Sequence, residues 1–461
     1  MKLSVTVLCS IFLCSIALNC HAQIAKPGPL RVGAAKVDVT PAASELPKQY
    51  LGVLDHVYSR AIVIDNGATS AALVTVDVIL MPDPMWKRLS GRIAAELGIP
   101  VKNIVLAGTG THSVPMGGAM PGPGGADEPV SPFDDKIVNS VKLAKQNLQP
   151  ARMSYGTGVS YINVNRDIID PKTHNWWEGP NYGGTSDKSV EVIKFESLSG
   201  EPIAVYYNYA VFNVITGTLD LVSGDITGAS SRYIEESLDN NAVAAFSLGA
   251  HGDQNPIYFQ QTFDLREIRI KDYAKRGEDI ANGMPPGGVG MDRNNPTVAK
   301  LMNQEKQMIL SMGQMLGEEV LHVMRGTDRA ESTVRIYGDQ KTVTCPGRQR
   351  TNEGRGGVAG TYKDADPVEI RLGVLMIGDI AVASVDGNPY SAIGLRLKKE
   401  SPYAKTMITT KANGMSAGGY MPDDASYGHQ TFEVLNTSLK PGCAESAIVN
   451  GIIDMMPQIN Y

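Results

Sequence analysis

The chain has 461 residues, 43% of them hydrophobic, and 42 basic against 48 acidic residues give a formal net charge of −6 at pH 7. This acidic balance argues against a nucleic-acid partner. The length and the apolar fraction are ample for a large core, built either as one α/β unit or as two lobes.

Residues 1–22 are interpreted as a secretory signal peptide. Lys2 precedes an apolar run at residues 5–18, and the small residue Ala22 favours cleavage before Gln23. The residues before Cys20 do not suit a lipoprotein signal, so we expect a secreted or periplasmic protein without a lipid anchor. No other stretch is long and apolar enough to span a bilayer, and residues 23–461 are expected to form a single α/β domain.

Cysteine and histidine spacing gives no metal signature. Three of the five cysteines lie in the signal peptide, which leaves Cys345 and Cys443. This pair could form one disulfide in an oxidising compartment, although spacing alone leaves the pairing open. Two cysteines cannot make a zinc site, and no His-x-x-x-His or similar ligand spacing joins the histidines outside the signal peptide, at positions 56, 112, 174, 251, 322 and 429.

The first block of the exported chain, at residues 31–148, alternates strand and helix signals. Its apolar runs predict buried strands at 61–64 and 71–80. A helix is expected at 86–97 because its apolar spacing is helical and Gly98 follows it. The next strand begins at Asn103.

The second block continues with the same two kinds of signal. Residues 190–195 and 203–209 predict a hairpin, 231–238 a short helix and 242–248 a buried strand. Residues 265–295 are polar and partly rich in glycine and proline, which favours an insertion or flap. A long Met-rich helix is expected at 296–324 with Asn295 as its cap, followed by strands at 333–348 and 368–385.

Two histidines follow predicted strands. The run NIVLAGTGTHSVP at 103–115 leads a strand into a loop that carries His112, and GAHGD at 249–253 does the same for His251. Because ligands bind at the carboxyl ends of strands in open α/β folds, a shared crevice is expected. The alternative for His112 is a hydrogen-bonded residue in a tight turn. The Gly/Pro-rich segment at 116–125 is expected to be a mobile lid or an ordinary surface loop.

Two further segments suggest binding. Trp176 and Trp177 stand together among polar and turn residues, which favours a stacking face for sugar rings or the edge of an apolar groove. Arg348, Arg350 and Arg355 lie in a basic segment at 348–360. They could meet an anionic substrate, but a solvated loop is the favoured interpretation.

Four segments in consistent order resemble the neutral ceramidases. In that family the strand that corresponds to 103–115 ends in Thr-His-Thr-His-Ser-Gly-Pro, and the other similar segments lie at 33–41, 55–61 and 249–256. The resemblance spans residues 31–456 and implies an α/β catalytic domain with a mixed sheet and flanking helices. Full ceramidases carry an additional C-terminal β-sandwich, which this chain is expected to lack.

The same resemblance implies that the family's zinc ligands are substituted. Its two zinc histidines correspond to Gly110 and Phe212, and its ligating glutamate corresponds to Asn388. Its tyrosine ligand faces Met415, with Tyr420 close by. Because at least three positions lack the donors that zinc requires, we expect no metal and no other cofactor.

The remaining polar residues make up the predicted site. Arg166 aligns with an arginine that the family keeps in its active site, although a surface salt bridge is the alternative. The catalytic candidates are His112, Arg166, His251, and Tyr420 or Tyr427. Substrate contacts are expected from Trp176, Trp177, Asn165, Asn388 and His429, the last being an addition to the family pattern.

Histidine, tyrosine and arginine together are suited to β-elimination at a uronic acid, where arginine neutralises the carboxylate and the other two transfer protons. The leading hypothesis is therefore a metal-independent lyase or dehydratase acting on an extracellular acidic oligosaccharide. The alternative is N-acyl amide hydrolysis of ceramide-like lipids, the activity that the resemblance implies. A catalytically inactive binding protein is the third possibility.

Overall fold

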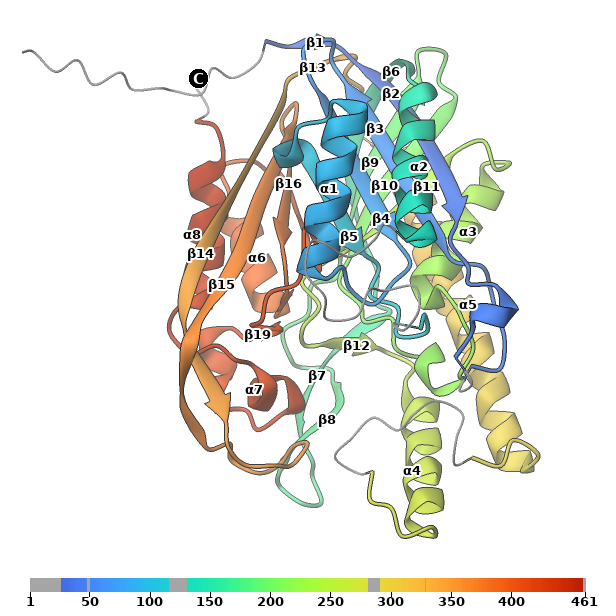
Figure 1. Ribbon diagram of the computed structural model, residues 1–461, viewed down its shortest axis with the longest axis vertical. Coiled ribbons are helices and arrows are strands. Elements are labelled where there is room, and N and C mark those ends of the chain that lie inside the picture. Colours follow the sequence, from blue (N-terminus) through green and yellow to red (C-terminus); the bar gives the residue numbers. More distant parts are fainter. Residues whose placement is uncertain (1–25, 48–49, 116–130, 281–290, 328, 459–461) are drawn as a thin grey trace, which may run out of the picture.

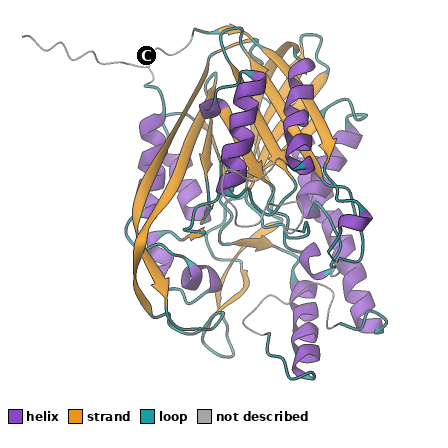
Figure 2. Ribbon diagram, in the orientation of Figure 1, coloured by secondary structure: helices purple, strands orange, loops and turns teal. Residues whose placement is uncertain are grey.

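The strands of the chain form two main sheets that share one apolar core. The computed structural model describes residues 26–47, 50–115, 131–280, 291–327 and 329–458, so the predicted signal peptide and the 116–125 segment lie outside it. Helices cover the outer faces of both sheets, which gives a helix–sheet–sheet–helix arrangement (Figures 1 and 2). The predicted mixed α/β fold is confirmed.

The larger sheet has eight strands and combines antiparallel neighbours with the parallel pairs β4/β5 and β10/β11. In spatial order the strands are β11 (Val243–Leu248), β10 (Pro202–Tyr209), β9 (Ser189–Ser197), β6 (Gln149–Val159), β2 (Arg31–Asp38), β3 (Tyr58–Asp65), β4 (Ser70–Val76) and β5 (Ile104–Gly108). The predicted hairpin is the antiparallel pair β9/β10, and the strands predicted at 61–64 and 71–80 are β3 and β4.

The second sheet has four strands, in the order β14 (Ile336–Arg350), β15 (Tyr362–Ile377), β16 (Ile380–Val385) and β18 (Lys405–Thr409). Three small sheets complete the set: β12 (Gln254–Pro256) with β7 (Asn163–Ile169) and β8 (Trp176–Asn181), β1 (Gly28–Pro29) with β13 (Thr333–Val334), and β17 (Asn388–Pro389) with β19 (Tyr420–Met421).

Alternation along the strands assigns residues to the two faces of the larger sheet. In β3, Ile62 and Ile64 pack toward the second sheet, whereas Ala61 and Val63 pack toward α1 (Asp83–Leu97) and α2 (Pro132–Gln146). The outer face of the second sheet is covered by α6 (Ser391–Glu400) and α8 (Ala444–Met455). Both faces of each sheet are therefore buried.

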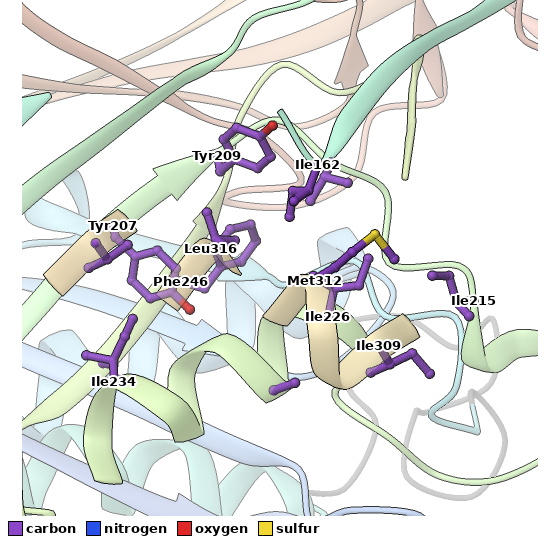
Figure 3. Packing of buried hydrophobic residues seen from close by; sticks show 14 of the residues in the cluster. Ile162, Tyr207, Tyr209, Ile215, Ile226, Ile234, Phe246, Ile309, Met312 and Leu316 are labelled. Atoms are coloured by element: carbon purple, nitrogen blue, oxygen red, sulfur yellow. The ribbon is translucent and has the colours of Figure 1, made fainter. Parts of the chain in front are cut away.

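The predicted helix at 296–324 is α5 (Pro296–Arg325), and its start and packing follow the sequence signals. Asn295 Oδ1 accepts from Thr297 N at 2.9 Å, so Asn295 is the cap. Met312 and Leu316 are fully buried against β10, β11 and α3 (Asp225–Ser237) (Figure 3). Burying a side chain of this size contributes about 1.5–3 kcal/mol, and Met312 is a core residue.

Two predicted elements differ from the structure. The helix expected at 231–238 is α3, which begins at Asp225, because its first two turns are small side chains buried under α5. The polar insertion expected at 265–295 contains a regular helix, α4 (Gln260–Ala274). The remaining short helix, α7, covers Phe432–Asn436.

A disulfide ties the long β14/β15 hairpin to the start of α8. Cys345 and Cys443 have sulfur atoms 2.04 Å apart, so the pairing that the sequence left open is formed. Among the residues that the structure describes, no helix has both the length and the apolar composition of a membrane span.

Candidate functional site

Four loops that follow strands meet beside one another, and backbone hydrogen bonds hold them together. Thr410 N donates to Leu248 O at 2.8 Å, which joins the loop after β18 to the end of β11. His112 N donates to Asn213 O at 3.0 Å, which joins the loop after β5 to the loop after β10. The loops that carry His112 and His251 therefore lie together, as the shared position at strand ends predicted.

The phenyl ring of Phe212 lies at the centre of this meeting point. The ring centroids of His251 and His112 are 4.4 and 6.1 Å from it, both edge-on. Two cations also face the ring: the Arg166 guanidinium carbon is 4.4 Å and Lys411 Nζ is 5.4 Å from the centroid. We name the six residues that meet here the strand-end cluster: His112, Arg166, Phe212, His251, Lys411 and Tyr420.

The two histidines of the cluster are neutral at pH 7. Burial, assisted by the neighbouring Lys411 cation, lowers the pKa of His251 well below its usual value. His112 is partly exposed, yet the packing around its ring and the same cation lower its pKa to about 3. His251 Nδ1 lies 3.0 Å from Gly249 O, and within the described ranges His251 Nε2 has no hydrogen-bond partner. A neutral imidazole with a free nitrogen can accept a proton.

Lys411 is a buried cation that the sequence did not single out. The residue is 3% exposed and has a left-handed backbone, with φ of 49°. Burial and then the Arg166 charge lower the pKa of Lys411 to about 7. In the part of the chain that the structure describes, no carboxylate forms an ion pair with its ammonium.

Arg166, by contrast, is held by several acceptors. One terminal nitrogen lies 2.7 Å from Glu433 Oε1 and donates to Gly252 O at 2.7 Å. The other is 3.7 Å from Glu178 Oε1 and 3.4 Å from Asn255 Oδ1, while Nε has no partner among the described residues. At 5% exposure, Arg166 does not form the surface salt bridge considered as the alternative. Any substrate carboxylate at this guanidinium competes with Glu433 and Glu178.

A second arrangement of polar groups adjoins the cluster on β7 and β8. His429 Nδ1 lies 3.0 Å from Asp167 Oδ2, and Tyr390 donates its hydroxyl to the same oxygen at 3.3 Å. The imidazole stacks on Trp176 with 3.9 Å between ring centroids and 21° between planes. Asp167 is 2% exposed, so a buried carboxylate orients the partly exposed His429 ring.

The remaining predicted site residues differ in their surroundings. Asn165 donates to Asp253 Oδ2 at 2.9 Å, so its amide already holds a structural contact. Asn388 pairs with Tyr420 between β17 and β19, and its side-chain oxygen is buried without a partner among the described residues. Tyr427 lies against Arg348, whose guanidinium is 5.1 Å from the Tyr427 ring, and no contact of the described chain joins Tyr427 to the strand-end cluster. Of the two candidate tyrosines, Tyr420 is the one that contacts Phe212 and Arg166.

The basic segment at 348–360 is tied down rather than solvated. Arg348 donates to Val434 O at 2.6 Å, and Arg350 donates to Gly354 O at 2.6 Å. Arg355 lies 3.1 Å from Glu178 Oε2. The expectation of a solvated loop is wrong for these three arginines, because carbonyl and carboxylate oxygens of the protein already bind them.

An apolar cavity of about 230 Å³ opens beside β8, β12 and α4. Its wall includes Tyr182 and Tyr258, which are 75% and 50% exposed. Asn255 also lines this cavity, and the same side chain contacts Arg166 and Glu178. The cavity therefore reaches the residues that bind the Arg166 guanidinium.

Sequence reasoning missed the acidic partners and the lone lysine of the site. Glu178 and Glu433 were not singled out, although both contact Arg166. Burial raises the pKa of Glu433 to about 8, against the attraction of the guanidinium. Lys411 follows the buried strand β18, and the rule that selected the two histidines at strand ends would also have selected it.

Comparison with known proteins identifies the fold. Residues of this chain align with neutral ceramidase of Pseudomonas aeruginosa at 27% identity over 281 residues, covering 54% of the chain and 42% of that protein. Neutral ceramidase A of Dictyostelium discoideum aligns at 26% identity, covering 52% of the chain and 38% of that protein. The aligned part thus spans about 40% of the length of these relatives.

The solved structures agree over a longer stretch. A structure titled as a ceramidase complexed with C2 superposes with a TM-score of 0.68 at 18% identity, covering 93% of this chain and 74% of that one. The neutral ceramidase from Pseudomonas aeruginosa superposes with a TM-score of 0.64 and the same coverage. The family model for the N-terminal part of neutral/alkaline non-lysosomal ceramidases matches residues 31–371, which is most of the chain, and the chain therefore belongs to this ceramidase family.

Proposed function

We propose that this protein hydrolyses an N-acyl amide, the type of bond that the ceramidase names of its relatives imply, and that it does so without a bound metal. The observation that carries the proposal is the apolar cavity that ends at Asn255, next to Arg166. A long acyl chain in this cavity brings its carbonyl toward the strand-end cluster. Ligand sites commonly combine such an apolar wall with a few polar groups.

The residues at the positions matched to the family's zinc ligands do not fit zinc. Gly110 has no side chain, Phe212 offers a phenyl ring, and Asn388 offers a neutral amide oxygen. Lys411 Nζ also lies 3.6 Å from the point where a Cβ of residue 110 would be, and it repels a dication. We therefore assign no step of the reaction to a metal.

The cluster can supply the proton transfers of amide hydrolysis by itself. A water molecule attacks the carbonyl carbon, and His251 Nε2 accepts its proton. The carbonyl oxygen becomes anionic, and the Arg166 Nε–H, which has no partner among the described residues, donates to it. When the C–N bond breaks, the nitrogen takes a proton from Tyr420, whose pKa burial raises so that the phenol stays protonated.

The test is hydrolysis of N-acyl amides with acyl chains of increasing length, in excess chelator, followed by mass spectrometry of the released fatty acid. We expect cleavage that improves with chain length and survives the chelator. Arg166→Met should lower kcat by about a hundredfold, the usual cost of a lost oxyanion donor. The proposal is contradicted if no amide is cleaved at any chain length, or if activity requires one bound zinc ion per chain.

The second candidate is β-elimination on a uronic-acid oligosaccharide. The specific observation in its favour is His429, oriented by Asp167 and stacked on Trp176, since an aromatic face beside a base suits a sugar ring. The pairing of Arg166 with Glu433 weighs against it, because that guanidinium was expected to bind the uronate. Ultraviolet absorbance of a conjugated carboxylate, formed from acidic oligosaccharides but absent with N-acyl amides, would favour this candidate over hydrolysis.

A further inference from the structure

Lys411 differs from Lys398 and Arg166, two other buried cations, because no carboxylate among the described residues pairs with it. Lys398 forms an ion pair with Asp187 at 2.7 Å, and Arg166 forms one with Glu433 at the same distance. In the described ranges the Lys411 ammonium lies 5.4 Å from the Phe212 ring centroid and near the Arg166 cation, and no carboxylate pairs with it. Burying a charge without a partner is costly, so proteins seldom keep one unless a ligand completes it.

Glycine at residue 110 keeps side-chain atoms away from the Lys411 ammonium. Gly110 has φ of +81°, and a Cβ there would lie 2.9 Å from Leu248 Cδ2 and 3.6 Å from Lys411 Nζ. Any larger side chain would press on Leu248 and crowd the ammonium. The left-handed backbone of Lys411 itself, at φ of 49°, is a second strained feature of the kind that concentrates at binding sites.

Of the two cations that face the Phe212 ring, Lys411 has no carboxylate beside it among the described residues. His112 and His251 are neutral, since burial lowers the pKa of both. The Arg166 guanidinium already has the carboxyl groups of Glu433 and Glu178 beside it. A ligand that matches the remaining cation carries a single negative charge, which is the charge of a carboxylate.

We propose that Lys411 binds a carboxylate of the substrate, so that the preferred substrate is an N-acyl amino acid, with its acyl chain in the cavity beside Asn255. This inference rests on the proposed amide hydrolysis and names its substrate class. It separates this chain from an enzyme for uncharged sphingoid amides, because an uncharged head group leaves the buried ammonium without a partner. Losing the carboxylate that pairs with Lys411 should weaken substrate binding by about tenfold or more.

The experiment compares N-decanoylglycine with its uncharged analogue N-decanoylglycinamide, by calorimetric binding and by cleavage. Wild type should favour the carboxylate by about tenfold or more in Kd. Lys411→Met should abolish the preference, and Lys411→Arg should restore part of it. Lys188→Met is the matched control, because burial also lowers the pKa of Lys188, a half-buried lysine that donates to Asn163 Oδ1 at 2.8 Å. The control should keep the preference.

The outcomes separate this inference from the proposed function. If the carboxylate binds through Lys411 but neither compound is cleaved, the anion site stands and the amide hydrolysis fails. If both compounds bind and are cleaved equally well, or if Lys411→Met keeps the preference, the anion site is overturned while the hydrolysis stands. Melting curves of each variant identify any that has lost its fold. If Lys411→Met is such a variant, the preference for the carboxylate is compared between wild type and Lys411→Arg.

Discussion

Replacing Lys411 by methionine should stabilise the protein below neutral pH. Methionine has a similar length and no charge, so the variant removes the uncompensated cation and keeps the packing. The pKa of Lys411 falls from 10.5 to about 7, and at 1.36 kcal/mol for each pH unit this difference corresponds to about 5 kcal/mol. The figure is an upper value, because it assigns the full cost of burial to the native state.

The direction of the pH dependence follows from proton binding to Lys411. Below pH 7 the lysine is charged in both the folded and the unfolded protein, so the folded protein bears the whole cost of burying the ammonium. Between pH 7 and 10.5 the unfolded chain binds a proton that the folded chain does not, so wild-type stability rises with pH. The advantage of Lys411→Met should therefore be greatest near pH 6, fall to about 2 kcal/mol at pH 9, and vanish above pH 10.5.

Urea unfolding of both proteins at pH 6 and pH 9, followed by circular dichroism, measures this difference. The control Lys188→Met should be destabilised, because its ammonium donates to Asn163 oxygens. A Lys411→Met variant that is no more stable than wild type at pH 6, or whose advantage is the same at both pH values, would refute the buried, unpaired state of this lysine.

Three further predictions concern contacts around the site. Glu178→Gln should cost about 2 kcal/mol at pH 7 by urea unfolding, because Arg166 and Arg355 lose a charged acceptor. The pKa of Glu178 is lowered by these two arginines against the effect of its burial, so the difference should shrink as the pH falls below 4.5. Reducing the Cys345–Cys443 disulfide, which spans 98 residues, should lower stability by about 2–5 kcal/mol, whereas a double serine variant should not respond to reductant. Gly110→Ala should cost about 1–2 kcal/mol in the same assay, since alanine is strained at φ of +81°; an unchanged midpoint would contradict that backbone conformation.

Much of the fold could be predicted because local signals and tertiary packing agree. Helix α5 has a cap, an apolar stripe and a buried face, and all three point to the same boundaries. Helix α3 was predicted too short, because its first residues are small and polar and become helical only under the cover of α5. Helix α4 was missed since its surface is mostly polar and few of its residues reach the core.

The site could be predicted only where a residue type already suggests chemistry. His112 and His251 were found by their position after strands, and the structure places both against Phe212. Lysine after a strand is usually a solvated residue, so the sequence did not mark Lys411. Its distinguishing property, the absence of a carboxylate nearby, depends on residues hundreds of positions away and is visible only in three dimensions.

The loops that meet at the strand-end cluster are joined through their backbones, as in the bond from Thr410 N to Leu248 O. Peptide groups form these links whatever side chain the residue carries. The crevice can therefore exchange its chemical groups during evolution without losing its shape. Such a scaffold makes inheritance of the fold a poor guide to inheritance of the reaction.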